Sequence, residues 1–159
     1  MENTIGIAAV HLSSFQVVGF KARTTNQAEM EGRGVISSMW ERVYQESVLE
    51  EIPGKTSPVT YAIYTDYESD ENGEYTFAIG TAAEGREVPK DLAIFAVPET
   101  SYVVFTSRRG PIREVVLEAW QYIWEWSRQN KRAFAVDFEL YDERCQDPDN
   151  SQVDIYISV

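Results

Sequence analysis

Residues 59–83, VTYAIYTDYESDENGEYTFAIGTAA, are the stretch that decides the fold. Two runs rich in β-branched and aromatic residues, 59–69 and 74–83, stand on either side of Asp70-Glu71-Asn72-Gly73. Runs of this composition are typical of strands. An Asn-Gly pair between two such runs favours a tight turn. The stretch therefore predicts an antiparallel β-hairpin.

A helix and two further strands are predicted on the N-terminal side of this hairpin. Residues 4–11 and 14–23 are rich in β-branched and aromatic residues, which favours extended structure. Residues 26–48 carry apolar side chains at helical spacing, although Gly32 and Gly34 weaken the first turns. From residue 14 onward, the first half of the chain thus reads strand, helix, strand, strand, and residues 4–11 form a further extended segment before it.

The second half of the chain repeats this order. A strand-like stretch at 91–108 precedes a helical pattern at 112–128, and strand patterns follow at 134–143 and 151–159. The halves, about 1–85 and 86–159, are two β-α-β-β units. One such unit alone cannot bury both its helix and its sheet. We therefore predict a single α+β domain over residues 1–159, in which the two units pack together.

Composition limits the classes of function. A net charge of −12, from 26 acidic and 14 basic residues, repels phosphate backbones, so direct nucleic-acid binding is not expected. No apolar run approaches the roughly 18 residues that span a bilayer, and the N-terminus lacks a signal-peptide pattern, which favours the cytoplasm. An acidic chain with 20 aromatic residues suits a flat, cationic partner.

Metal and cofactor sites are not predicted. One cysteine, Cys145, and one histidine, His11, permit neither a disulfide nor a site with two histidine or cysteine ligands. The acidic residues at 66–74 lack the glycine and final glutamate of an EF-hand, so they read as a solvated hairpin tip. No phosphate-binding loop or Ser-His-Asp arrangement is present either.

Four phrases resemble the GyrI-like family, also called the effector-binding domain of AraC- and MerR-type regulators. In the second half they are SYVVFTSRRGP (101–111), AWQYIWEWS (119–127) and DFELYDER…VDIYISV (137–159). In the first half, VTYAIYTDYESDENGEYTFAIG (59–80) resembles the integron-cassette and YdeE-like branch. The matched phrases extend over nearly the whole chain, so it resembles the free-standing members. The family's terminal Ile-Pro-Val is replaced by Ile157-Ser158-Val159, a difference confined to the last strand.

This resemblance implies a more specific fold and ligand. Two β-α-β-β units related by a pseudo-two-fold axis would form an antiparallel sheet with helices on one side and a central ligand groove. Aromatic residues would line the groove, and a buried glutamate would face the positive charge of the ligand. Matching the family's glutamate-bearing strand to this sequence places that acid at Glu139.

Strand alternation gives Glu139 a neighbour on the same face. Residues two apart on a strand share a face, so Glu139 and Tyr141 point one way and Phe138 and Leu140 the other. With Phe138 and Leu140 packed under the helices, Glu139 and Tyr141 face the space between the two halves. The alternative is a solvated glutamate on an exposed sheet face.

Five aromatic residues besides Tyr141 are candidates for ligand contact. Trp40 and Trp120 lie in the two helical patterns. Trp40 reads equally as a core residue or as a wall of the groove, whereas Trp120, one helical turn from Trp124, is more typical of a packed residue. The others lie in strand patterns: Tyr64, Tyr102 and Phe105. Alternation separates Tyr64 from Tyr61, Ile63, Thr65 and Tyr67, and it leaves open which set faces the groove.

Three functions remain possible at this stage. The first is a binding protein for multi-ring, lipophilic, cationic compounds, which would serve as a sensor or sequestering domain linked to transcription regulation or drug response. Such a protein would act as a monomer or homodimer and could have a regulatory protein as its partner. The second is a hydrolase of cyclopropane-bearing electrophiles, as the resemblance implies, with Glu139 as base, Tyr141 as donor and Trp40 as stacking surface. The third is interaction with DNA gyrase through the acidic surface. Binding without catalysis is the main prediction.

Overall fold

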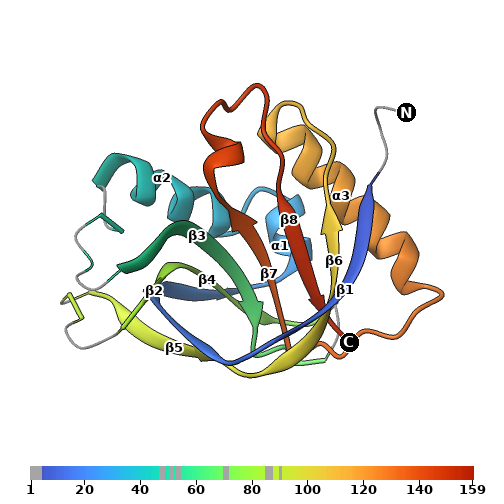
Figure 1. The fold of residues 1–159 in the computed structure, drawn as a ribbon, viewed down its shortest axis with the longest axis horizontal. Helices are drawn as coiled ribbons and strands as arrows, with labels where there is room; N and C mark the ends of the chain where they lie inside the picture. Colours follow the sequence, from blue (N-terminus) through green and yellow to red (C-terminus); the bar gives the residue numbers. More distant parts are fainter. Residues whose placement is uncertain are drawn as a thin grey trace.

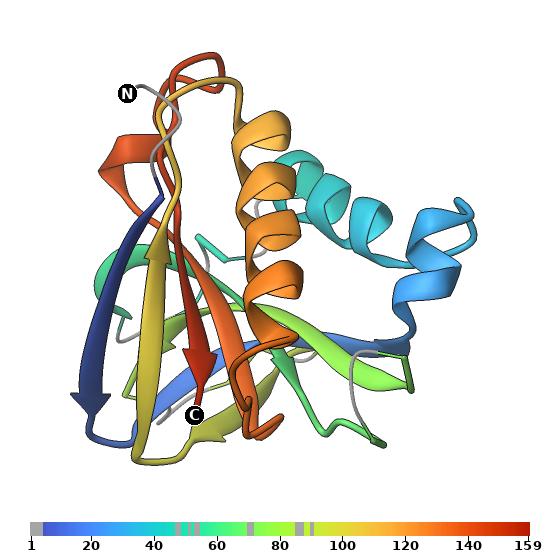
Figure 2. The same ribbon diagram turned by 90° about the vertical axis from the view of Figure 1, so that its right-hand side faces the viewer.

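In the part of the chain that the structure describes, eight antiparallel strands form one sheet, and three helices lie on one of its faces (Figures 1 and 2). The computed structural model describes residues 5–46, 49–50, 52, 55–69, 72–84, 88–89 and 91–159. The sheet order is β1-β6-β8-β7-β3-β4-β2-β5. The strands are β1 (Gly6–Leu12), β2 (Phe15–Thr24), β3 (Lys55–Thr65), β4 (Tyr75–Ala83), β5 (Ala93–Val97), β6 (Thr100–Thr106), β7 (Val136–Tyr141) and β8 (Asp154–Ser158).

The helices follow the predicted positions with one interruption. They are α1 (Asn26–Met30), α2 (Ile36–Glu46) and α3 (Ile112–Ser127), and a 3-10 turn, η1, spans Glu143–Cys145. The single helix predicted at 26–48 is wrong, because the chain turns between α1 and α2. Gly32 has a φ of 80°, a left-handed conformation that glycine adopts readily and that ends a helix.

The predicted hairpin is formed by β3 and β4, in which Ala62 pairs with Ile79. Between the end of β3 and the start of β4, the Glu68 N–H donates to the Glu74 carbonyl at 2.8 Å. Asp70 and Glu71 of the predicted turn lie outside the described residues. The hairpin is extended by β7, which pairs with β3 on the side away from β4.

The two halves have the same order of elements, as predicted. The first runs β2, α1 and α2, β3, β4, and the second runs β6, α3, β7, β8. They meet where β3 pairs with β7, with Ala62 opposite Glu139. Each half also begins with an additional strand that pairs with the other half, β1 with β6 and β5 with β2. The predicted strand at 91–108 is therefore two strands, β5 and β6.

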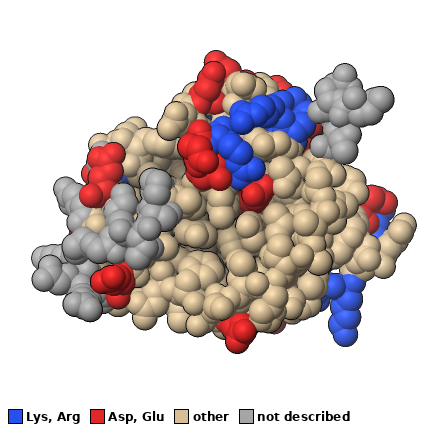
Figure 3. Space-filling model, viewed as in Figure 1, with Lys and Arg blue, Asp and Glu red and all other residues tan. Residues whose placement is uncertain are grey.

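The sheet separates two packed layers. On the helix side lie one cluster that includes Phe77 and Met39 and another that includes Phe105 and Ile123. On the far side Phe138 stacks on Tyr156, with ring centroids 4.5 Å apart. Figure 3 shows the far face of the sheet, whose broad centre is uncharged. Among the described residues, no helix has both the length and the apolar character to cross a membrane.

Candidate ligand-binding site

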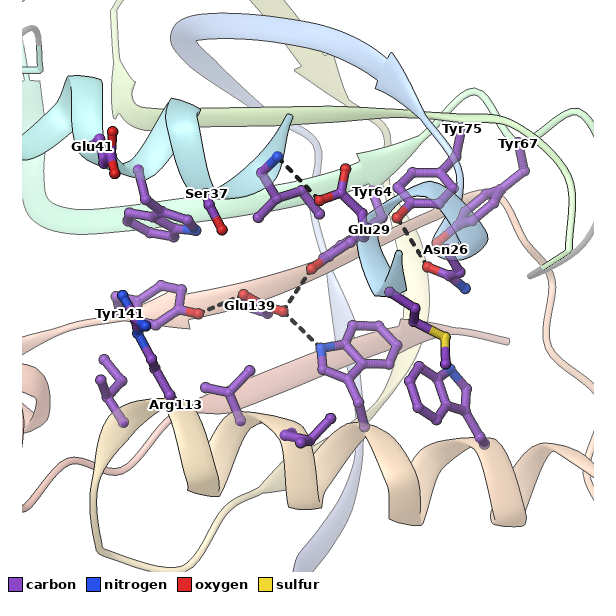
Figure 4. Close-up of a pocket in the computed structure, with 18 of the residues that line it drawn as sticks. Asn26, Glu29, Ser37, Glu41, Tyr64, Tyr67, Tyr75, Arg113, Glu139 and Tyr141 are labelled. Carbon is purple, nitrogen blue, oxygen red and sulfur yellow. Dashed lines mark hydrogen bonds between the residues drawn. The ribbon is translucent and has the colours of Figure 1, made fainter. Parts of the chain in front are cut away.

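A pocket of about 570 Å³ lies between the three helices and the centre of the sheet. This volume is within the range of small-molecule sites. Strands β3, β4 and β7 form its floor, and α1, α2 and α3 form its walls (Figure 4). The pocket thus lies where the two halves of the chain meet.

The helices present tryptophans to the pocket because of their spacing. In α3, Val115, Ala119 and Ile123 are fully buried against the sheet. Trp120 and Trp124 are each one residue further along, about 100° around the helix axis, and line the pocket. In α2 the same relation holds between buried Met39 and Trp40.

Glu139 lies on the pocket floor and has three hydrogen-bond donors. Its side chain is buried, with 3% of the residue exposed. The hydroxyl of Tyr64 and the Nε1–H of Trp120 donate to Oε2 at 2.8 and 2.7 Å, and the hydroxyl of Tyr141 donates to Oε1 at 2.5 Å (Figure 4). In the described part of the chain, no basic side chain lies within 4.0 Å of this carboxylate.

The pKa values of this group reflect burial. Burial raises the pKa of Glu139 above its ordinary value, and the hydrogen bonds from Tyr141, Trp120 and Tyr64 offset only part of that increase. Burial, followed by the charge of Glu139, raises the pKa of Tyr64 and of Tyr141 well above the usual range. Both hydroxyls therefore stay protonated and act as donors.

A second acid, Asp137, lies two residues before Glu139 and has a different set of partners. It is fully buried, and Arg132 Nη2 lies 2.7 Å from its Oδ2. The hydroxyl of Tyr67 also donates to Oδ2, at 2.5 Å, and the Ser158 N–H donates to Oδ1 at 2.8 Å. The negative charge of Asp137 is thus balanced inside the protein, whereas that of Glu139 is stabilised only by neutral donors.

The aromatic rings around Glu139 pack edge to face. The ring centroids of Trp40 and Tyr141 are 5.0 Å apart at 73°, and those of Tyr64 and Trp120 are 5.2 Å apart at 66°. This geometry fixes the rings whose polar atoms hold the carboxylate. It leaves ring surface on the pocket walls for a flat or multi-ring ligand.

The structure brings together most, but not all, of the residues that the sequence suggested. Glu139, Tyr141, Trp40, Tyr64 and Trp120 line the pocket. Phe138 and Leu140 point the other way, as alternation predicted, but they pack on the far face and not under the helices. The pocket lies on the helix side because α2 and α3 leave space above β7.

Tyr102 and Phe105 do not line this pocket, and that expectation is corrected. Both lie on β6, which is separated from the pocket floor by β8. Tyr102 is buried on the far face against Phe138 and Tyr156. Phe105 is buried beneath α3, where its ring meets that of Trp126 at 5.1 Å. Their separation of three residues does put them on opposite faces.

Sequence reasoning missed several lining residues. Tyr64 and Tyr67 both reach the pocket, although alternation put them on opposite faces. The reason is Asp66, whose φ of 50° ends the regular strand after Thr65. Arg132 lies in the segment after α3, where no periodicity marks it. Among the described residues, no group of three or more His, Cys, Asp or Glu is placed to hold a metal ion.

Comparison with known proteins identifies the family. Residues 9–159 match the family model described as integron-associated effector binding protein. The chain belongs to this family. Its relatives include YobU of Bacillus subtilis (strain 168), named as a candidate transcriptional regulator, which is 37% identical over 152 residues that cover 94% of each chain.

Two solved structures have the same fold. An integron cassette protein from the mobile metagenome of Vibrio cholerae is 29% identical, with a TM-score of 0.78 over 97% of this chain and 95% of that one. SAV2435, solved bound to tetraphenylphosphonium, is 20% identical, with a TM-score of 0.79 over 97% and 93% of the two chains. At this identity, the second likeness concerns the fold alone.

Proposed function

We propose that this effector-binding protein binds bulky, lipophilic organic cations without chemical change. In this role it is a sensor or a sequestering protein linked to transcription regulation or drug response. The observation that supports the proposal most strongly is Glu139, a buried carboxylate whose charge has no cationic partner among the described residues. A cation in the pocket would supply that partner.

Physical chemistry favours this class of ligand. In a pocket of low polarity, a pair of opposite charges attracts more strongly than in water. Binding is favourable only when this attraction exceeds the free-energy cost of removing water from the ligand, so a weakly hydrated ligand is preferred. Large organic cations are weakly hydrated because their charge is spread over apolar groups. The walls add aromatic contact from Trp40, Trp120 and Trp124, and each cation–π contact contributes about 0.5–2 kcal/mol.

The test compares a cation with a neutral molecule of similar shape. Tryptophan fluorescence of the protein is titrated with tetraphenylphosphonium and with triphenylphosphine oxide. We expect saturable quenching by the cation and at least about tenfold weaker binding of the neutral compound, the equivalent of about 1.4 kcal/mol. Equal affinity for both compounds would show that the pocket recognises aromatic surface alone and that Glu139 does not select charge.

Hydrolysis of strained electrophiles is a second candidate because of the environment of Glu139. Its raised pKa and the adjacent Tyr141 hydroxyl suit a general base beside a hydrogen-bond donor. Glu139 would take a proton from water as the water oxygen bonds to one cyclopropane carbon. The ring C–C bond breaks, its electron pair passes to the other carbon of that bond, and this released position then accepts the proton. Binding is the preferred proposal, because three donors already occupy the carboxylate.

Chromatography of a cyclopropane-bearing electrophile incubated with wild type and Glu139→Gln distinguishes the hydrolase proposal from the binding proposal, since only catalysis gives product.

A further inference from the structure

The wall of the pocket formed by α1 has few packing contacts of its own. This helix has five residues, none of which is buried, and Met30 at its end is 81% exposed. Even so, α1 contributes three residues to the pocket lining: Asn26, Glu29 and Met30. A helix this short is not stable by itself. Its position must therefore be fixed by specific contacts.

The side chain of Glu29 makes the main contact between α1 and α2. Its Oε2 accepts from the Val35 N–H at 2.8 Å and from the Thr24 hydroxyl at 2.5 Å, and its Oε1 accepts from the Ile36 N–H at 3.3 Å. The two N–H groups are at the start of α2, where backbone donors have no partner within the helix. The carboxylate of Glu29 thus caps α2 from a different helix (Figure 4).

The turn between the helices is built around this contact. A Cβ atom at Gly34 would lie 2.0 Å from the Glu29 carboxylate, so a larger residue there and Glu29 in its present position exclude each other. A second contact between α1 and the sheet is at the first residue of the helix, where the Tyr75 hydroxyl donates to Asn26 Oδ1 at 2.9 Å. The end of α1 that carries Met30 therefore depends on Glu29.

We infer that Glu29 is the positioning residue that gives the pocket its preference for multi-ring ligands. Its carboxylate holds α1 against the start of α2, so that Met30 and Asn26 close one side of the pocket. We assign it a positioning role because two of its three donors are the backbone N–H groups at the start of α2. A small cation needs only Glu139 and the tryptophans, whereas a large one also contacts α1. This inference rests on the proposed binding of organic cations.

The experiment uses the full chain and two cations of equal charge, the one-ring trimethylphenylammonium and the four-ring tetraphenylphosphonium. Four variants are compared with wild type. Glu29→Ala removes the contact, Gly34→Ala displaces the carboxylate but keeps its charge, and Glu29→Gln keeps an acceptor oxygen but loses the charge. Gln27→Ala, an exposed change on α1 outside the pocket lining, is the matched control. Dissociation constants and hydrogen exchange at the Val35 and Ile36 amides are measured for each.

For Glu29→Ala and Gly34→Ala we expect tetraphenylphosphonium to bind about tenfold more weakly, a usual size for coupling between sites. Trimethylphenylammonium binding should stay within about twofold. Exchange at both amides should accelerate in these variants, and Gln27→Ala should resemble wild type. Glu29→Gln should protect the Val35 amide but not the Ile36 amide, because its oxygen can replace Oε2 while its NH2 group cannot accept a hydrogen bond in place of Oε1. Faster exchange without a change in ligand preference would overturn the inference, because Glu29 would then be structural only. Weak binding of both cations in Glu29→Gln, with Gly34→Ala unaffected, would also overturn it, because Glu29 would then act through its charge. If wild type binds neither cation, the proposed function fails, and the exchange rates still decide whether Glu29 holds α1.

Discussion

Asp137 and Glu139 are two buried acids on the same face of the same strand, and among the described residues only Asp137 has a basic partner. Asp137 has Arg132 at 2.7 Å, a tyrosine and a backbone N–H. Glu139 has two tyrosines and a tryptophan. Burial of a charge costs several kcal/mol unless it is paired. The difference teaches that a buried acid indicates a ligand site when no basic side chain of the protein pairs with it, because a cationic ligand can then neutralise its charge.

The largest expected effect comes from removing the cation beside Asp137. Arg132→Met should lower the free energy of unfolding by about 3–5 kcal/mol, because it leaves a buried carboxylate without its partner. Urea unfolding followed by circular dichroism measures the change. The double variant Arg132→Met/Asp137→Asn should recover part of the loss. If Arg132→Met alone unfolds like wild type, the two acids do not differ in the way described.

The next effect is on the pH dependence of binding. The raised pKa of Glu139 means that the folded protein holds this proton more tightly than the unfolded chain. Stability from the protonated form is therefore present below the ordinary glutamate pKa of 4.5 and is lost as pH rises through the raised value. A cation binds the ionised form, so its affinity should rise over the same interval.

Tetraphenylphosphonium titrations between about pH 4.5 and pH 8 measure this dependence. Glu139→Gln cannot ionise at this position, so its affinity at each pH measures the effect of all other titrating groups. Such an effect is expected for a chain of net charge −12. Wild-type affinity should increase with pH by more than that of the variant. Parallel curves would mean that the charge of Glu139 does not contribute to binding.

A smaller effect is expected when one donor to Glu139 is removed. Trp120→Phe keeps an aromatic ring on the pocket wall but loses the Nε1–H that donates to Oε2 at 2.7 Å. Since this bond favours the ionised carboxylate, its loss should raise the pKa of Glu139 further and move the midpoint of the pH dependence upward. Trp124→Phe changes the neighbouring wall without touching the carboxylate, and it should leave the midpoint in place.

The smallest effect is expected on the far side of the sheet. The hydroxyl of Tyr102 is buried, and no hydrogen-bond partner lies near it among the described residues. Tyr102→Phe should therefore change the free energy of unfolding by less than about 0.5 kcal/mol and leave tetraphenylphosphonium affinity unchanged. Thermal unfolding and the same fluorescence titration measure both. A clear loss of binding would return Tyr102 to the list of ligand contacts.

The fold could be predicted from the sequence because its signals are local. The hairpin at 59–83 and the helix that carries Trp120 depend on residue spacing, and the strand-helix-strand-strand order appears twice along the chain. Alternation also placed Glu139 and Tyr141 on one face. The only sign of the break between α1 and α2 in the sequence was a pair of glycines, Gly32 and Gly34, that weakens the helical pattern. The left-handed φ at Gly32 is a property of the folded turn and could not be read from the sequence.

The site was harder to predict because it depends on contacts between distant segments. Tyr67 reaches the pocket through an irregular backbone at Asp66, and Arg132 approaches from a segment without periodicity. Tyr102 and Phe105 were misplaced because spacing along β6 does not reveal which strands lie between it and the pocket. A preference for aromatic residues in a strand gives no information on whether they line a cavity or fill a core.

The central claim is tested most directly by measuring two quantities on Glu139→Gln at neutral pH, the tetraphenylphosphonium dissociation constant and the free energy of unfolding. We predict that affinity falls by at least about tenfold while stability is unchanged or slightly higher, because the variant no longer buries an unbalanced charge. Unchanged affinity, or a loss of stability as large as that of Arg132→Met, would contradict the account.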